Sequence, residues 1–223
     1  MRHAKSVSCL AALLLCAGAT SAAAQPRYEV SITNLTKTQR FTPILVATHR
    51  PTLSLFHLGQ PAPAELALVA EEGNIGPLAA LLEGSSAVAD TAQSSGLLDP
   101  GATVTVEVEA GGGTRRLSVV AMLIPTNDAF FALNSELLPL GSLPLTFYAV
   151  AYDSGSEVND ELCASIPGPF FSECGGPGGG AAPSGGEEGF VHVHSGIHGA
   201  GDFDEAARDW RNPVARIVVR RIS

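Results

Sequence analysis

The sequence predicts an all-β protein, an antiparallel β-sandwich with short helical insertions and one glycine-rich loop. Several segments alternate between apolar and polar residues with a period of two, which is typical of half-buried strands. Two further segments are continuously apolar, as central strands are. The segments with helical character are short and lie between the expected strands. We therefore expect two packed sheets to form the core.

The expected strands are spread over the whole chain. They cover residues 28–33, 102–110, 116–124, 145–152, 190–194 and 214–222. In the second of them Val104, Val106 and Val108 alternate with threonine and glutamate, so that one face is apolar. The strands at 116–124 and 145–152 are the continuously apolar pair.

Short helices and one mobile loop are expected in the connections. Residues 61–74 and 75–84 are amphipathic, and 203–210 can form another helical turn. Residues 175–189 contain eight glycines in fifteen positions, which indicates a surface loop. A predicted strand follows directly, so this loop is not expected to be a domain boundary.

Residues 1–24 have the features of a cleaved secretory signal peptide. Arg2 and Lys5 precede an apolar run that ends at small residues and is too short for a membrane anchor. We therefore expect residues 25–223 to form one secreted or periplasmic domain without a transmembrane anchor. Loss of the signal lowers Lys plus Arg from 13 to 11 against 22 acidic residues, and the net charge from −9 to −11. This charge argues against nucleic acid as a partner.

Cys163 and Cys174 follow the signal and are expected to form a disulfide. An exported pair of cysteines with ten residues between them is most simply a disulfide. A thiolate metal site is the weaker interpretation, because such sites usually contain CxxC pairs.

Two loops at strand ends carry oxygen-bearing side chains. They are TND at 126–128 and DSGSE at 153–157. Gly155 permits a sharp turn, so we expect Asp153 and Glu157 to point towards one place. A hard cation such as calcium binds about six to eight oxygen atoms, and two acidic loops can supply them. Solvated acids in turns are the alternative interpretation.

The same segments resemble the spondin amino-terminal domain family. The similar motifs are YEVSITNLT, FTPILVATHR, MLIPTNDAFF, AYDSGSE, EGFVHVHSGIHG and DWRNPVARIVV, which together span about residues 27–222. Spondin domains are extracellular β-sandwiches that bind calcium through acidic residues of two loops. The resemblance implies calcium ligands at Asp128, Asp153 and Glu157, completed by nearby backbone carbonyls. Glu157 stands where animal members have aspartate.

A histidine cluster at 190–199 is the second candidate metal site. His192 and His194 are expected to share one face of a strand, and His198 can supply a third nitrogen. Imidazole is a ligand that zinc and copper favour.

Structural roles for these histidines are the alternative interpretation. Their rings can hydrogen-bond backbone groups and acids such as Asp202 and Asp204. Of the other histidines of the exported domain, His49 and His57 are expected in an early loop, and the sequence does not place them near the cluster.

Three functional hypotheses follow from these observations. The first is a calcium-binding β-sandwich that acts as a binding or adhesion module for an extracellular or cell-surface protein or glycan. The second is a small copper- or zinc-binding protein, redox-active or not, that uses the histidine cluster. The third is a structural envelope protein without either ion. No enzyme is predicted, because GxSxG, HExxH, CxxC and phosphate-loop motifs are missing from the sequence.

Overall fold

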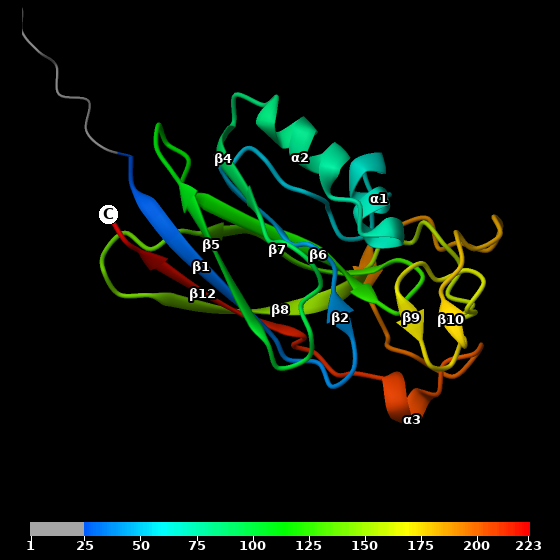
Figure 1. The fold of residues 1–223 in the computed structure, drawn as a ribbon. Helices are drawn as coiled ribbons and strands as arrows, with labels where there is room; N and C mark the ends of the chain where they lie inside the picture. The colour runs from blue at the N-terminus through cyan, green and yellow to red at the C-terminus, as the bar shows by residue number, and fades with distance from the viewer. Residues whose placement is uncertain (1–24) are drawn as a thin grey trace, which may run out of the picture.

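The computed structural model describes residues 25–223, so the predicted signal peptide lies outside the described part of the chain. Antiparallel strands form two packed layers, and two short helices cover one of them (Figure 1). The all-β prediction is therefore confirmed. Among the described residues, none of the helices is long and apolar enough to cross a membrane.

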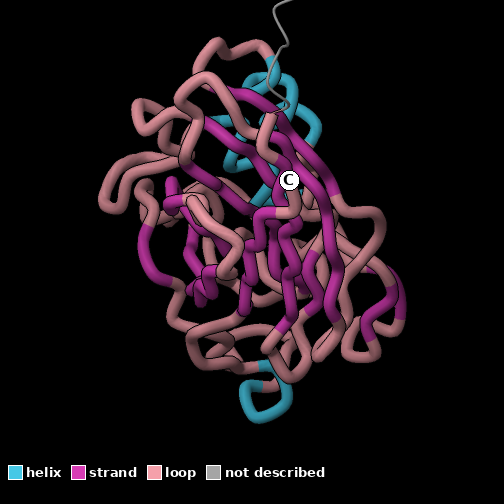
Figure 2. The backbone as a smooth tube through the Cα atoms, turned by 90° about the vertical axis from the view of Figure 1, so that its left-hand side faces the viewer, coloured by secondary structure: helices cyan, strands magenta, loops and turns pink. Residues whose placement is uncertain are grey.

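Twelve strands and three helices make up the fold of the described residues. The strands are β1 (Arg27–Asn34), β2 (Arg40–Phe41), β3 (Leu45–His49), β4 (Val88–Gln93), β5 (Thr103–Glu109), β6 (Arg116–Ile124), β7 (Ala129–Leu137), β8 (Leu145–Asp153), β9 (Phe170–Phe171), β10 (Gly176–Pro177), β11 (His192–Val193) and β12 (Ala215–Arg221). The helices are α1 (Ala64–Glu72), α2 (Gly76–Glu83) and α3 (Glu205–Arg208). Figure 2 shows the strands between the α1–α2 pair at the top and α3 at the bottom.

Strand β8 joins the two layers. The strand order is β4-β3-β6-β7-β8-β12-β1-β5. The first part of β8, from Leu145 to Ala149, pairs with β12, whereas Val150 to Asp153 pair with β7. The chain thus passes from one sheet to the other within a single strand. The short strand β11 pairs with the end of β8 at Tyr152 and Asp153.

Strands β6 and β7 are apolar on both faces because each face contacts a different apolar cluster. Val119 and Phe131 point into the core between the sheets, where Phe131 packs on Phe41 with ring centroids 4.4 Å apart. Their neighbours Val120 and Phe130 pack against α1 and α2 on the outer face. This two-sided burial explains the continuous apolar run that marks β6 as a central strand.

Several details differ from the predictions. β3, β4 and β7 are strands that the sequence analysis did not predict, and His49 ends β3 rather than lying in a loop. The strand expected at 190–194 is reduced to the two residues of β11. Part of the glycine-rich segment pairs as β10 with β9. These pairings depend on distant segments, which a local pattern does not reveal.

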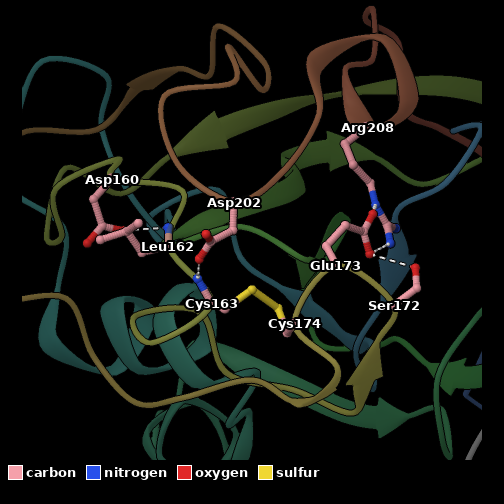
Figure 3. The surroundings of a disulfide bond; sticks show 8 residues. All are labelled: Asp160, Leu162, Cys163, Ser172, Glu173, Cys174, Asp202 and Arg208. Carbon is pink, nitrogen blue, oxygen red and sulfur yellow. Dashed lines mark hydrogen bonds and ion pairs between the residues drawn. A yellow bond between two sulfur atoms is a disulfide. The ribbon is translucent and has the colours of Figure 1, made fainter.

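The disulfide between Cys163 and Cys174 is present, as predicted. Their Cα atoms are 5.5 Å apart. Figure 3 shows how this segment is fixed to the chain before β12: the carboxylate of Asp202 accepts the N–H of Cys163 at 2.8 Å, and Glu173 accepts two hydrogen bonds from Arg208 at 2.6 and 2.8 Å. The crosslink therefore stabilises a loop-rich end that has little regular structure of its own.

Replacement of both cysteines by alanine is expected to lower the free energy of unfolding by about 3 kcal/mol, because the crosslink restricts a short loop in the unfolded chain. Urea denaturation of the variant and of the oxidised wild type measures this change. Wild-type protein treated with a reductant is the control and should match the variant. Equal stability of the variant and the oxidised protein would contradict the prediction.

Candidate metal centre

The acidic and the histidine segments meet at one end of the sandwich. This is the end in Figure 1 where the loops drawn in yellow and orange gather, away from the described C-terminus. In the sheet, Asp153 at the end of β8 lies directly opposite Ala129 on one side and His192 on the other. Residues directly opposite each other in antiparallel strands have side chains on the same face. The two sites that the sequence suggested are therefore neighbours.

Asp128 is fully buried and fixes the first acidic loop to the second. Its Oδ2 atom accepts hydrogen bonds from the hydroxyl of Ser154 at 2.8 Å and from the N–H groups of Ser156 and Glu157 at 2.9 and 3.1 Å. Its Oδ1 atom is buried without a hydrogen-bond partner. One half of this carboxylate thus remains available to a ligand.

Asp153 lies between the acidic loops and the histidines. Its Oδ1 accepts the N–H of Gly155 and its Oδ2 the side-chain amide of Asn159, both at 2.7 Å. The Nε2 atoms of His192 and His194 are each 3.7 Å from one of these oxygens. This separation is too long for a direct hydrogen bond.

The two aspartates create a region of uncompensated negative charge. Burial raises the pKa of Asp128 to about 6, and the nearby charge of Asp153 adds to the rise. Burial also raises the pKa of Asp153. No lysine or arginine within residues 25–223 forms an ion pair with either carboxylate.

Glu157 ends the second acidic loop, and its backbone N–H donates to Asp128. Its Oε1 accepts the N–H of Ala182 at 3.2 Å, and the side chain lines a small cavity together with Glu71 and Pro167. Burial, followed by the charges of nearby acids, raises the pKa of Glu157 to about 7. The structure thus brings Asp128 to Asp153. One oxygen of Glu157 contacts the glycine-rich loop, and its other oxygen, Oε2, is buried without a hydrogen-bond partner.

The two histidines of the HVH segment differ in their hydrogen bonds. The Nδ1 of His192 lies 3.1 Å from the carbonyl oxygen of Val193, which can only accept, so this nitrogen carries the proton. The Nδ1 of His194 accepts the N–H of Gly196 at 2.9 Å, so the proton of the neutral ring is on Nε2. Burial lowers the pKa of His194 to about 4, and the ring lies 5.0 Å from that of Trp210.

The acids proposed as alternative partners of these histidines have other roles. Asp202 accepts the N–H of Cys163, and Asp204 caps α3 through the N–H of Ala207. That part of the structural interpretation is wrong, because Asp153 is the carboxylate that both rings face.

His198 and His49 do not enter the group around Asp153. His198 is exposed, and its backbone N–H donates to the buried carboxylate of Glu161 at 2.6 Å. His49, the last residue of β3, is buried, and its ring contacts the hydroxyl of Ser118 on β6.

Glu188 is a candidate residue that sequence reasoning missed. Within residues 25–223, one group of potential ligands has its atoms within 4.8 Å of one another, and it consists of Asp153, Glu188 and His192. Glu188 ends the glycine-rich loop, four positions before His192. The short spacing between Glu188 and His192 was the one signal in the sequence. The glycines around Glu188 gave no reason to expect its side chain in a fixed position.

Gly155 allows the segment of Glu188 and His192 to approach Asp153. Its φ is +66°, and a Cβ at this position would lie 2.4 Å from the carbonyl oxygen of Phe190. The N–H of Gly189 donates to the carbonyl of Gly155 at 2.8 Å. The close approach therefore needs both the left-handed conformation and the missing side chain.

Replacement of Gly155 by alanine is expected to destabilise the protein by more than the roughly 1–2 kcal/mol of left-handed strain, because the new Cβ also displaces the segment at Phe190. Gly96→Ala is the matched control, since Gly96 has φ +69° and open space around its Cβ position. Urea denaturation of the two variants measures the difference. Equal losses would show that the close approach is not needed.

The comparison with known families agrees with this architecture. The family model described as Spondin_N matches residues 28–139, which is half of the chain. The match includes Asp128 and ends before Asp153, Glu188 and His192. A search of curated proteins found no match. The family and the disulfide indicate an extracellular or secreted protein. The chain belongs to the spondin N-terminal domain family.

Proposed function

We propose that this protein is an exported binding module with a divalent cation at the loop end of its sandwich, and that it binds a partner rather than catalysing a reaction. One observation carries the proposal. Asp128 and Asp153 are buried neighbours, and no lysine or arginine of the described chain pairs with them. Buried charges normally have a counter-charge or coordinate a metal, and a divalent cation neutralises two carboxylates at once.

The cation has a structural role in this proposal. Asp128 belongs to the loop between β6 and β7, Asp153 ends β8, and β11 lies on the far side of Asp153. An ion bound between them joins these separate segments. The bound ion stabilises the folded protein by linkage and holds the loops in one arrangement for a partner.

Calcium is the ion that the family resemblance implies. Asp128 and Asp153 supply the first oxygens of a shell that needs about six to eight, with backbone carbonyls and water as the remainder. Glu157 can add a further oxygen, because its Oε2 is buried without a hydrogen-bond partner while Oε1 accepts the N–H of Ala182.

An extracellular protein or glycan is the partner that this end of the molecule suits. Phe190 is 42% exposed and its ring lies 5.5 Å from that of His192. Leu162, which follows the buried Glu161, is also exposed. Exposed aromatic and apolar side chains beside fixed loops are typical of recognition surfaces.

A redox site built on three histidines has less support. The Nδ1 of His194 is occupied by a backbone N–H, so the neutral ring offers a donor at Nε2 and not a lone pair. The side chain of His198 is exposed.

Asp128→Asn tests the cation directly. Asparagine keeps an oxygen that accepts the hydrogen bonds from the second loop but removes one charge. We expect wild-type protein to gain about 2.7 kcal/mol of stability when the ion is at a hundred times its dissociation constant. The variant should lose most of this gain, and without ion it should be at least as stable as wild type because the two carboxylates no longer repel each other. Thermal melting with calcium, with zinc and with chelator measures both effects.

Asp99→Asn is the control for this experiment, because Asp99 is exposed and pairs with Arg40 rather than with Asp128 or Asp153. It should respond to ions as wild type does. The proposal fails when neither calcium nor zinc shifts the melting temperature of wild-type protein, or when Asp128→Asn responds as strongly as Asp99→Asn.

A further inference from the structure

We propose that the ion at this end is a transition metal of the zinc class, held by Nε2 of His192 together with the carboxylates of Asp153 and Glu188. This inference rests on the proposed function of a cation at the loop end. It replaces the calcium shell around Asp128 and Asp153 by a site in which Asp153 is a ligand and Asp128 is not. Ligand atoms of these three side chains lie within 4.8 Å of one another. They come from the end of β8, the end of the glycine-rich loop and β11.

The distance between His192 and Asp153 fits a shared metal ion. Nε2 of His192 is 3.7 Å from Oδ1 of Asp153. In a tetrahedral site with bonds of about 2.0–2.2 Å, neighbouring ligand atoms lie roughly 3.3–3.6 Å apart. The pair is therefore too far apart for a hydrogen bond and close to the spacing of two ligands on one ion.

His192 is already in the form that binds metal through Nε2. The carbonyl of Val193 accepts the proton of Nδ1, which leaves the lone pair on Nε2. This nitrogen is buried and has no hydrogen-bond partner. A backbone carbonyl that fixes the tautomer in this way is the usual outer-shell partner of a metal-bound histidine.

His194 and Asp128 lie next to Asp153 but are not in the group of three ligands. Both side chains are almost fully buried, and Nε2 of His194 and Oδ1 of Asp128 have no partner. Nε2 of His194 carries the proton of the neutral ring and lies 3.7 Å from Oδ2 of Asp153, so it offers no lone pair to the ion. Asp128 adds negative charge beside Asp153. Neither residue is a ligand in this proposal, and the ligands are the three side chains named above.

The donor set distinguishes a transition metal from calcium. Calcium needs about six to eight oxygen ligands, and an imidazole nitrogen is a poor substitute for one of them. One imidazole and two carboxylates match zinc, which often keeps a fourth position open for water or for a group of a partner. Glu188 is exposed, which gives this site access to solvent.

Metal binding by the full-length protein, purified without chelator, tests the assignment. Zinc and calcium affinities are measured by titration calorimetry, and cobalt(II) is used as a spectroscopic probe of the ligands. We expect one zinc per chain, bound more tightly than calcium. His192→Ala and Glu188→Gln should each weaken zinc binding at least tenfold and alter the visible spectrum of the cobalt form. Neither residue is in the buried core, so both variants should fold.

Glu187→Gln is the matched control, because Glu187 is the exposed neighbour of Glu188 and is not in the ligand group. It should bind zinc as wild type does. Calcium binding without zinc binding, or zinc binding that survives both His192→Ala and Glu188→Gln, would overturn this assignment and leave the proposed cation function standing. If neither ion binds, the proposed function fails as well.

Discussion

The pairing of strand β8 with three other strands is the constraint on which this structure depends. A strand has two hydrogen-bonding edges, and β8 uses one edge for β7 and the other first for β12 and then for β11. The pairings with β7 and β12 join the two layers of the sandwich. The pairing with β11 places His192 beside Asp153. A shift of β8 by one residue would turn Asp153 to the opposite face and separate it from both the acidic loop and the histidine.

The loop end combines a stable scaffold with an electrostatic penalty. Backbone N–H groups from the DSGSE loop bind Asp128 and Asp153, and these hydrogen bonds offset part of the cost of burying two carboxylates. Burial raises the pKa of both carboxylates, so part of this cost remains. In our proposal a bound cation removes this penalty, so that the same interaction stabilises the fold and fixes the loops that meet a partner.

Most of the fold was predictable because strand patterns are local. The alternation in β1 and β5 and the apolar runs of β6 and β8 gave correct strands and a correct fold class. β3, β4 and β7 were missed, and the strand expected around His192 is short. Strand formation in such segments depends on the neighbour that they meet, and neighbours far apart in sequence leave no periodic signal.

The sequence by itself determined the types of residue that the site contains: two acidic loops at strand ends, an HVH segment and a disulfide pair. Only the tertiary structure decided that the acidic loops and the HVH segment lie together, that Glu188 lies beside Asp153 and His192, and that one oxygen of Glu157 accepts the N–H of Ala182. It also gave His192 and His194 different tautomers. The physical reason is that residue type and spacing are local properties, whereas convergence and protonation depend on backbone groups that other segments bring into contact.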